Sequence, residues 1–161
     1  MTNSQSLKIG LDYHGVIDCN PSYFSQFCAK AANRGHRIII ITGGPSPKIK
    51  KLLEKHHILY HHIFAITDYY QALRRIEQRP DGSFAIPQNL WNRAKGDFCQ
   101  YNRIDFHIDD SLSYKQWFST PFCMFNCKDF SCELPDNRKI LLTEDANSMI
   151  KTIENYCRKT P

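Results

Sequence analysis

The 161-residue sequence lacks the features of several protein classes. It has no run of about 18 apolar residues, the length that a membrane-spanning helix requires, so we expect no membrane span. The first residues, MTNSQSLKIG, have neither the basic nor the apolar segment of a secretory signal peptide. Internal repeats, low-complexity linkers and paired C-x-x-C sequences, which would indicate a zinc site, are also absent. We therefore predict one domain, spanning residues 1–161 and located in the cytoplasm.

The composition is that of an ordinary soluble globular protein with a mild excess of positive charge. Hydrophobic residues make up 42% of the chain and charged residues 23%, and the length is sufficient to bury a core. A formal net charge of +5 is compatible with an anionic substrate but is not diagnostic of nucleic-acid binding. Seven cysteines without an export signal favour free thiols in a reducing compartment over a disulfide framework.

Short apolar runs alternate with helical patterns along the chain. Six runs are typical of strands: 7–11, 38–41, 63–67, 106–108, 122–125 and, most weakly, 140–142. Helices are expected over 21–34, 46–56, 69–79, 90–101 and 145–158, with a small local hairpin or arm at 84–86. This alternation indicates βαβ units, so we predict an α/β protein with a three-layer α/β/α, Rossmann-like arrangement around a mainly parallel sheet.

Polar residues follow three of these strands. Asp12 follows the first strand, Thr42 and Gly43 follow the second, and Asp109 and Asp110 follow the fourth. An open parallel sheet binds its ligand at the carboxyl ends of its strands. If these strands are neighbours, their polar residues converge on one crevice, which Lys95 would reach from the start of a helix.

Each of these residues also has an ordinary structural explanation. Asp12 could cap a turn, and Asp109 and Asp110 could cap the following helix. Thr42 could belong to a plain strand-to-helix turn, and Lys95 could be a solvated surface lysine. In the functional alternative, the carboxylates serve as nucleophile and Mg²⁺ ligands, whereas the hydroxyl, glycine N–H groups and ammonium bind phosphate.

The order of these residues resembles that of the haloacid dehalogenase superfamily of phosphohydrolases, over about residues 7–125. The first motif of that superfamily, an apolar strand followed by Asp-x-Asp-Gly-(Val/Thr), corresponds to 12–16. The second motif of the superfamily corresponds to Thr42 and its lysine motif to Lys95. Its fourth, acidic motif corresponds to the pair Asp109-Asp110. The resemblance implies a Mg²⁺-dependent phosphatase acting on a phosphate monoester.

The resemblance also implies roles for individual residues. Asp12 would attack phosphorus and form an aspartyl-phosphate that water then cleaves. Mg²⁺ would be held by Asp12, by the backbone carbonyl of His14 and by Asp110, with Asp109 in a supporting position unless the two acids exchange roles.

The resemblance assigns phosphate binding to a second group of residues. Thr42 and the N–H of Gly43 would bind the transferring phosphoryl group, with Lys95 beside them as a catalytic cation. Such a site acts through positioning and charge stabilisation.

His14 occupies the position of the second Asp of the first motif. In phosphatases of the superfamily that Asp protonates the leaving group and later activates water, and an imidazole can do both near neutral pH. Three outcomes remain open: His14 acts as the acid and base, the enzyme is slow or catalyses another reaction such as phosphoryl transfer, or the site only binds phosphate.

The spacing of the motifs leaves little room for a cap domain. Only about 20 residues separate the first turn from the second strand, and residues 79–89 could form no more than a small lid. An open site suits a phosphorylated macromolecule, or a small molecule enclosed by oligomerisation, with the oligomeric state undetermined. The alternatives are a non-catalytic phosphate-binding or partner-binding module and an enzyme that processes phosphorylated ends of nucleic acids.

Overall fold

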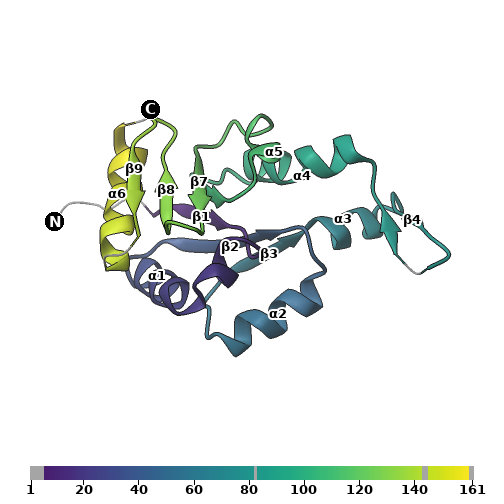
Figure 1. Ribbon diagram of the computed structural model, residues 1–161, viewed down its shortest axis with the longest axis horizontal. Coiled ribbons are helices and arrows are strands. Elements are labelled where there is room, and N and C mark those ends of the chain that lie inside the picture. The colour runs from purple at the N-terminus through teal and green to yellow at the C-terminus, as the bar shows by residue number, and fades with distance from the viewer. Residues whose placement is uncertain (1–5, 82, 143–144, 160–161) are drawn as a thin grey trace.

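A seven-stranded mixed sheet forms the centre of the computed structural model, which describes residues 6–81, 83–142 and 145–159. The strand order is β3-β2-β1-β6-β7-β8-β9 (Figure 1). Their bounds are β1 Lys8–Leu11, β2 Arg37–Thr42, β3 His62–Ala65, β6 Phe106–Asp109, β7 Phe122–Asn126, β8 Ser131–Glu133 and β9 Lys139–Leu141. Strands β3, β2, β1, β6 and β7 are parallel to one another, and β8 and β9 extend the sheet in antiparallel pairing. The predicted α/β class is confirmed.

Helices cover both faces of this sheet. Side chains of α1 (Pro21–Asn33), α2 (Ser46–Lys55) and α6 (Ala146–Lys159) belong to one buried apolar cluster, and those of α3 (Ile66–Ala72) and α4 (Gln88–Tyr101) belong to another. Strand β2 contributes Ile38 and Ile40 to the first cluster and Ile39 and Ile41 to the second. Its continuous β-branched run is therefore explained by burial on both faces. Among the residues described, none of the helices combines the length and apolar composition needed to cross a bilayer.

Two segments differ from the sequence prediction. The helix expected over 69–79 is instead α3, which ends at Ala72, because Arg74 has a φ of 54°, a left-handed conformation that a helix cannot continue through. The chain then forms β4 (Glu77–Gln78), which pairs antiparallel with β5 (Phe84–Ala85), so the predicted local hairpin is present. Strand β8 was not predicted, since its three residues contain no apolar run and depend on pairing with β7 and β9.

The cysteines also differ from the expectation of free thiols. Disulfides join Cys19 to Cys127 and Cys123 to Cys132, whereas Cys28, Cys99 and Cys157 are free. The first disulfide links the 3₁₀ turn η1 (Ile17–Cys19) to the turn between β7 and β8, across 108 residues of sequence. The second disulfide joins the paired strands β7 and β8. The prediction was wrong for these four residues because spacing alone reveals neither which distant turns are neighbours nor that β8 pairs with β7.

Candidate functional site

The site is built at the edge where strands β1, β2 and β6 end. Strand β1 lies between the other two, with Leu11 opposite Ile40 on one side and Ile108 on the other. Asp12 follows directly, and its N–H donates to the carbonyl of Ile108 at 3.0 Å. The side chain of Asp12 is therefore held beside the end of β6, with the residue only 6% exposed.

Lys95 bridges two of the predicted carboxylates. Its Nζ lies 2.7 Å from Oδ2 of Asp12 and 2.7 Å from Oδ2 of Asp109. The residue is 1% exposed and its ammonium lies 4.6 Å from the centre of the Tyr114 ring. Lys95 comes from the middle of α4 and not, as expected, from the start of a helix. Its burial and its two ion pairs argue against the alternative of a solvated surface lysine.

Asp109 is completely buried and anchored by several donors. It accepts hydrogen bonds from Lys95, from His107 Nε2 at 3.1 Å and from the N–H of Ser111 at 3.0 Å. Burial raises its pKa, but the bond from His107 and the charge of Lys95 outweigh this, so its pKa lies below the usual value. Burial lowers the pKa of His107, although its hydrogen bond with Asp109 opposes this effect.

Asp110 is exposed and lies directly against the loop after β1. An ideal Cβ built on Gly15 would lie only 2.0 Å from Oδ2 of Asp110, and Gly15 has a φ of 79°. Both the close approach and the left-handed backbone require glycine at this position. Burial and the neighbouring charge of Asp109 raise the pKa of Asp110.

The three carboxylates form a cluster whose chemistry fits a divalent cation. Oxygen atoms of Asp12, Asp109 and Asp110 all lie within 4.8 Å of one another. Burial, opposed by Lys95 and assisted by Asp109, raises the pKa of Asp12 to about 7. When all the groups are ionised, three carboxylates and one ammonium leave two negative charges, which one divalent cation would neutralise.

Thr42 is the predicted phosphate-binding residue at the end of β2. It is fully buried, and among the described residues its Oγ1 has no hydrogen-bond partner. Buried hydroxyls normally find a partner, because desolvating one without compensation is costly. The hydroxyl is therefore available to a ligand or to an ordered water.

Two aromatic residues connect the loop after Thr42 to Lys95. An ideal Cβ on Gly43 would lie 2.8 Å from the ring of Trp91, so the indole packs closely over this glycine. Trp91 Nε1 donates to the hydroxyl of Tyr114 at 2.9 Å, and the Tyr114 ring lies beside the ammonium of Lys95. This chain of contacts holds the two predicted phosphate-binding elements in a fixed relation.

His14 lies at the open side of the site. Its side chain is 53% exposed, and its Nδ1 lies 3.2 Å from Oδ2 of Asp18. The other oxygen of Asp18 accepts the N–H of Gly15 at 2.7 Å. Since an ideal Cβ on Gly44 would lie 3.7 Å from His14 Nε2, the imidazole stands between Asp18 and the loop after β2.

Sequence reasoning missed four residues of this site: Asp18, Trp91, His107 and Tyr114. Two of them have a local signal, because His107 shares a strand face with Asp109 two residues later, and Asp18 follows His14 by four residues. The aromatic pair has none, since it joins α4 to α5 (Leu112–Lys115) through tertiary contact.

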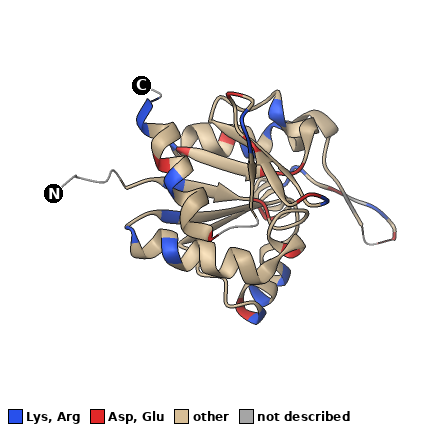
Figure 2. Cartoon of the chain, turned by 60° about the vertical axis from the view of Figure 1, so that its left-hand side comes forward, with Lys and Arg blue, Asp and Glu red and all other residues tan. Residues whose placement is uncertain are grey.

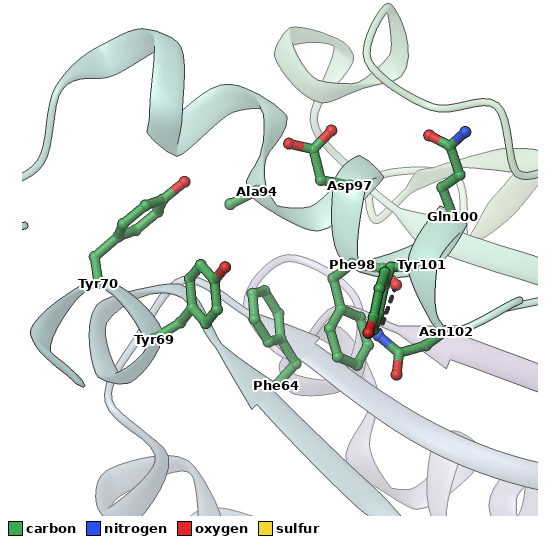
Figure 3. Close-up of a pocket in the computed structure, with 9 residues that line it drawn as sticks. All are labelled: Phe64, Tyr69, Tyr70, Ala94, Asp97, Phe98, Gln100, Tyr101 and Asn102. Carbon is green, nitrogen blue, oxygen red and sulfur yellow. Dashed lines mark hydrogen bonds between the residues drawn. The ribbon is translucent and has the colours of Figure 1, made fainter. Parts of the chain in front are cut away.

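A separate cavity of about 800 Å³ lies between α3 and α4. Figure 3 shows it lined mainly by aromatic rings, among which Phe64 and Phe98 stack with their centres 4.2 Å apart. None of the predicted site residues lines it. We therefore do not assign the phosphate chemistry to this cavity.

Comparison with models of known protein families finds no match to the chain, and no curated protein matches it either.

Proposed function

We propose that this chain is a Mg²⁺-dependent phosphohydrolase of the haloacid dehalogenase type, which cleaves a phosphate monoester through an aspartyl-phosphate. The observation that supports this most is the buried bridge of Lys95 between Asp12 and Asp109, with the carboxylate of Asp110 beside it. A lysine held in this way keeps Asp12 close to a positive charge where an anionic phosphate would approach.

The metal would be held by Asp12, by Asp110 and by the backbone carbonyl of His14. A bound Mg²⁺ would neutralise charge on the phosphoryl group and orient it for in-line attack. Asp109 is fully buried and accepts from three donors, Lys95, His107 and the N–H of Ser111, which favours a supporting role in which it orients Lys95.

The reaction would proceed in two steps. An oxygen of Asp12 forms a bond to phosphorus as the bond from phosphorus to the ester oxygen breaks, and imidazolium of His14 gives its proton to the leaving oxygen. Water then attacks the phosphorus of the aspartyl-phosphate, His14 takes a proton from that water, and phosphate and free Asp12 are released.

Phosphate binding would use the loop after β2. The free hydroxyl of Thr42 and the N–H of Gly43 would donate to phosphoryl oxygens, and Lys95 would oppose their charge. This arrangement gives the buried Thr42 hydroxyl a partner that the described residues do not supply.

A capless, Rossmann-like fold of this family is part of the proposal. The chain between β1 and β2 contains η1 and α1, and the segment between α3 and α4 contains the short β4–β5 hairpin. Both segments are short, which supports the proposal of a site without a separate cap domain.

A panel of phosphate monoesters tests the proposal, measured with Mg²⁺ and with a chelator. It should include an aryl phosphate, sugar phosphates and oligonucleotides with terminal phosphates. We expect Mg²⁺-dependent release of phosphate that Asp12→Asn abolishes. Hydrolysis that survives in Asp12→Asn would contradict the proposed nucleophile, and a properly folded wild type inactive on every ester would favour the binding-module alternative.

Two variants of His14 test its proposed role as acid and base. We expect His14→Ala to lower turnover at neutral pH and His14→Asp to retain it, since either an imidazole or a carboxyl group can move the proton. Full activity in His14→Ala would exclude the acid and base role.

Charged residues of both signs occur on helices and loops in Figure 2, which gives no preference between nucleic acid and smaller substrates. Activity confined to oligonucleotide ends and falling steeply with salt would favour the nucleic-acid alternative.

A further inference from the structure

A second cleft, of about 350 Å³, begins at Asp110 and extends over the strands β7, β8 and β9. Asn126, Lys128, Glu133 and Lys139 are among its other lining residues. Asp110 also belongs to the candidate metal site, so the cleft and that site share this residue, and a group attached to a phosphate bound there would lie beside the cleft. The group attached to that phosphate is its natural occupant.

The cleft exists because one face of the antiparallel strands is open. Met124 pairs with Glu133, and Glu133 pairs with Lys139, so these three side chains share a face of the sheet. On this face Glu133 and Lys139 are exposed, whereas the alternate residues Phe125 and Cys132 face the main core and are buried. These strands form one end of the sheet (Figure 1).

The turn from β7 to β8 holds Lys128 at the same edge as Asp110. Asn126 Oδ1 accepts the N–H of Lys128 at 3.0 Å, and the disulfide from Cys127 to Cys19 ties the turn to η1. Lys128 is therefore presented by an anchored segment, which reduces the entropy lost when it binds a ligand.

Lys128 is also the free cation of the cleft. Lys139 pairs with Asp129, but Lys128 has no ion-pair partner among the described residues. Glu133 likewise has no ion-pair partner among the described residues. Because Glu133 pairs with Met124, and Met124 pairs with Asp109, Glu133 lies level with Asp109 and farther from the end of the sheet than the turn that carries Lys128. Lys128 therefore lies in the turn at the end of β7, at the edge of the sheet where Asp110 lies, whereas Glu133 lies farther back along the strand.

We propose that this cleft is the leaving-group subsite, and that Lys128 selects substrates whose leaving group carries a second anionic group, a carboxylate or a phosphate. The inference rests on the proposed phosphohydrolase function and specifies its substrate class.

Two matched pairs of substrates test it. 2-Phosphoglycerate carries a carboxylate where glycerol 2-phosphate carries a hydroxymethyl group, and glycerol 1,3-bisphosphate carries one more phosphate than glycerol 1-phosphate. We expect kcat/KM of wild type to favour the more anionic member of at least one pair about tenfold, the range of a hydrogen bond to a charged group. The pair that shows this preference identifies the anionic group.

The variant Lys128→Met should bring this ratio close to one. Lys151→Met, which removes an exposed lysine of α6 and the same charge, should leave it unchanged. Glu133→Gln should increase the ratio, because it removes a negative charge from the cleft. A ratio that survives in Lys128→Met, or falls equally in Lys151→Met, would overturn the inference.

Binding to the Asp12→Asn variant separates the inference from the proposed function. Calorimetric titration with each substrate pair measures the subsite without turnover, and Lys128→Met in this background should remove the preference. If wild type hydrolyses none of the esters, the phosphohydrolase proposal fails. If it hydrolyses both members of each pair equally and binds them equally, only the subsite fails.

Discussion

The free hydroxyl of Thr42 leads to an unusual prediction, in which one substitution stabilises the fold and impairs its function. Thr42→Val replaces a buried, unpartnered hydroxyl by a methyl group of similar shape. Leaving such a group unsatisfied costs about 1 to 3 kcal/mol, so we expect the free energy of unfolding to rise by about 1 to 2 kcal/mol. At about 2 to 4 °C per kcal/mol for a chain of this size, Tm should rise by about 2 to 8 °C.

Activity should change in the opposite direction. Loss of a hydrogen bond to a charged phosphoryl group costs about 1.5 to 3 kcal/mol, which corresponds to a fall in kcat/KM of about tenfold to a hundredfold. Thr42→Ser is the matched control: it keeps the hydroxyl and should keep activity, while loss of a buried methyl group should cost about 1 kcal/mol of stability. Urea unfolding and phosphate release measure both quantities, and a less stable or fully active Thr42→Val would refute the reasoning.

Three further predictions concern charge and backbone conformation. Lys95→Met should destabilise by about 3 to 5 kcal/mol in urea unfolding, because it leaves two buried carboxylates without their cation, and a loss below about 1 kcal/mol would contradict that bridge. Gly35→Ala should cost about 1 to 2 kcal/mol through its positive φ, and Gly15→Ala should cost more, because its Cβ would also clash with Asp110. Only Gly15→Ala should weaken Mg²⁺ binding in calorimetry, because only its Cβ meets the metal-site carboxylate, and equal binding in the two variants would contradict this. A hydrogen bond from Arg34 lowers the pKa of Glu154, despite burial, below its usual 4.5. Its stabilisation is therefore present above pH 4.5 and lost as pH falls through the folded-state pKa, so Glu154→Gln should unfold less steeply with acid than wild type.

Much of the fold follows from local patterns in the sequence. The run from Ile38 to Ile41 predicts a strand buried on both faces, and β2 has that environment. The end of α3 was harder to predict. The helix stops at a left-handed residue, Arg74, within a polar stretch that has no proline or glycine at this point to indicate a helix end. Strand β8 depends on pairing with its neighbours, which no short sequence window contains.

The candidate site divides in the same way. Asp12, Thr42 and Asp109 were predictable, because each stands at or directly after the end of an apolar strand. Trp91 and Tyr114 were not, because their contact joins two helices through side chains alone.

The sequence by itself determined which polar residues follow the strands and in what order they occur, since strand periodicity and the residues that follow each strand are local properties. Tertiary structure decided which of them meet. It placed the ammonium of Lys95 between two carboxylates, set Asp110 against Gly15, and opened a cleft beside Lys128. Those relations depend on how distant strands and turns pack against one another, and the spacing of residues along the chain does not contain that information.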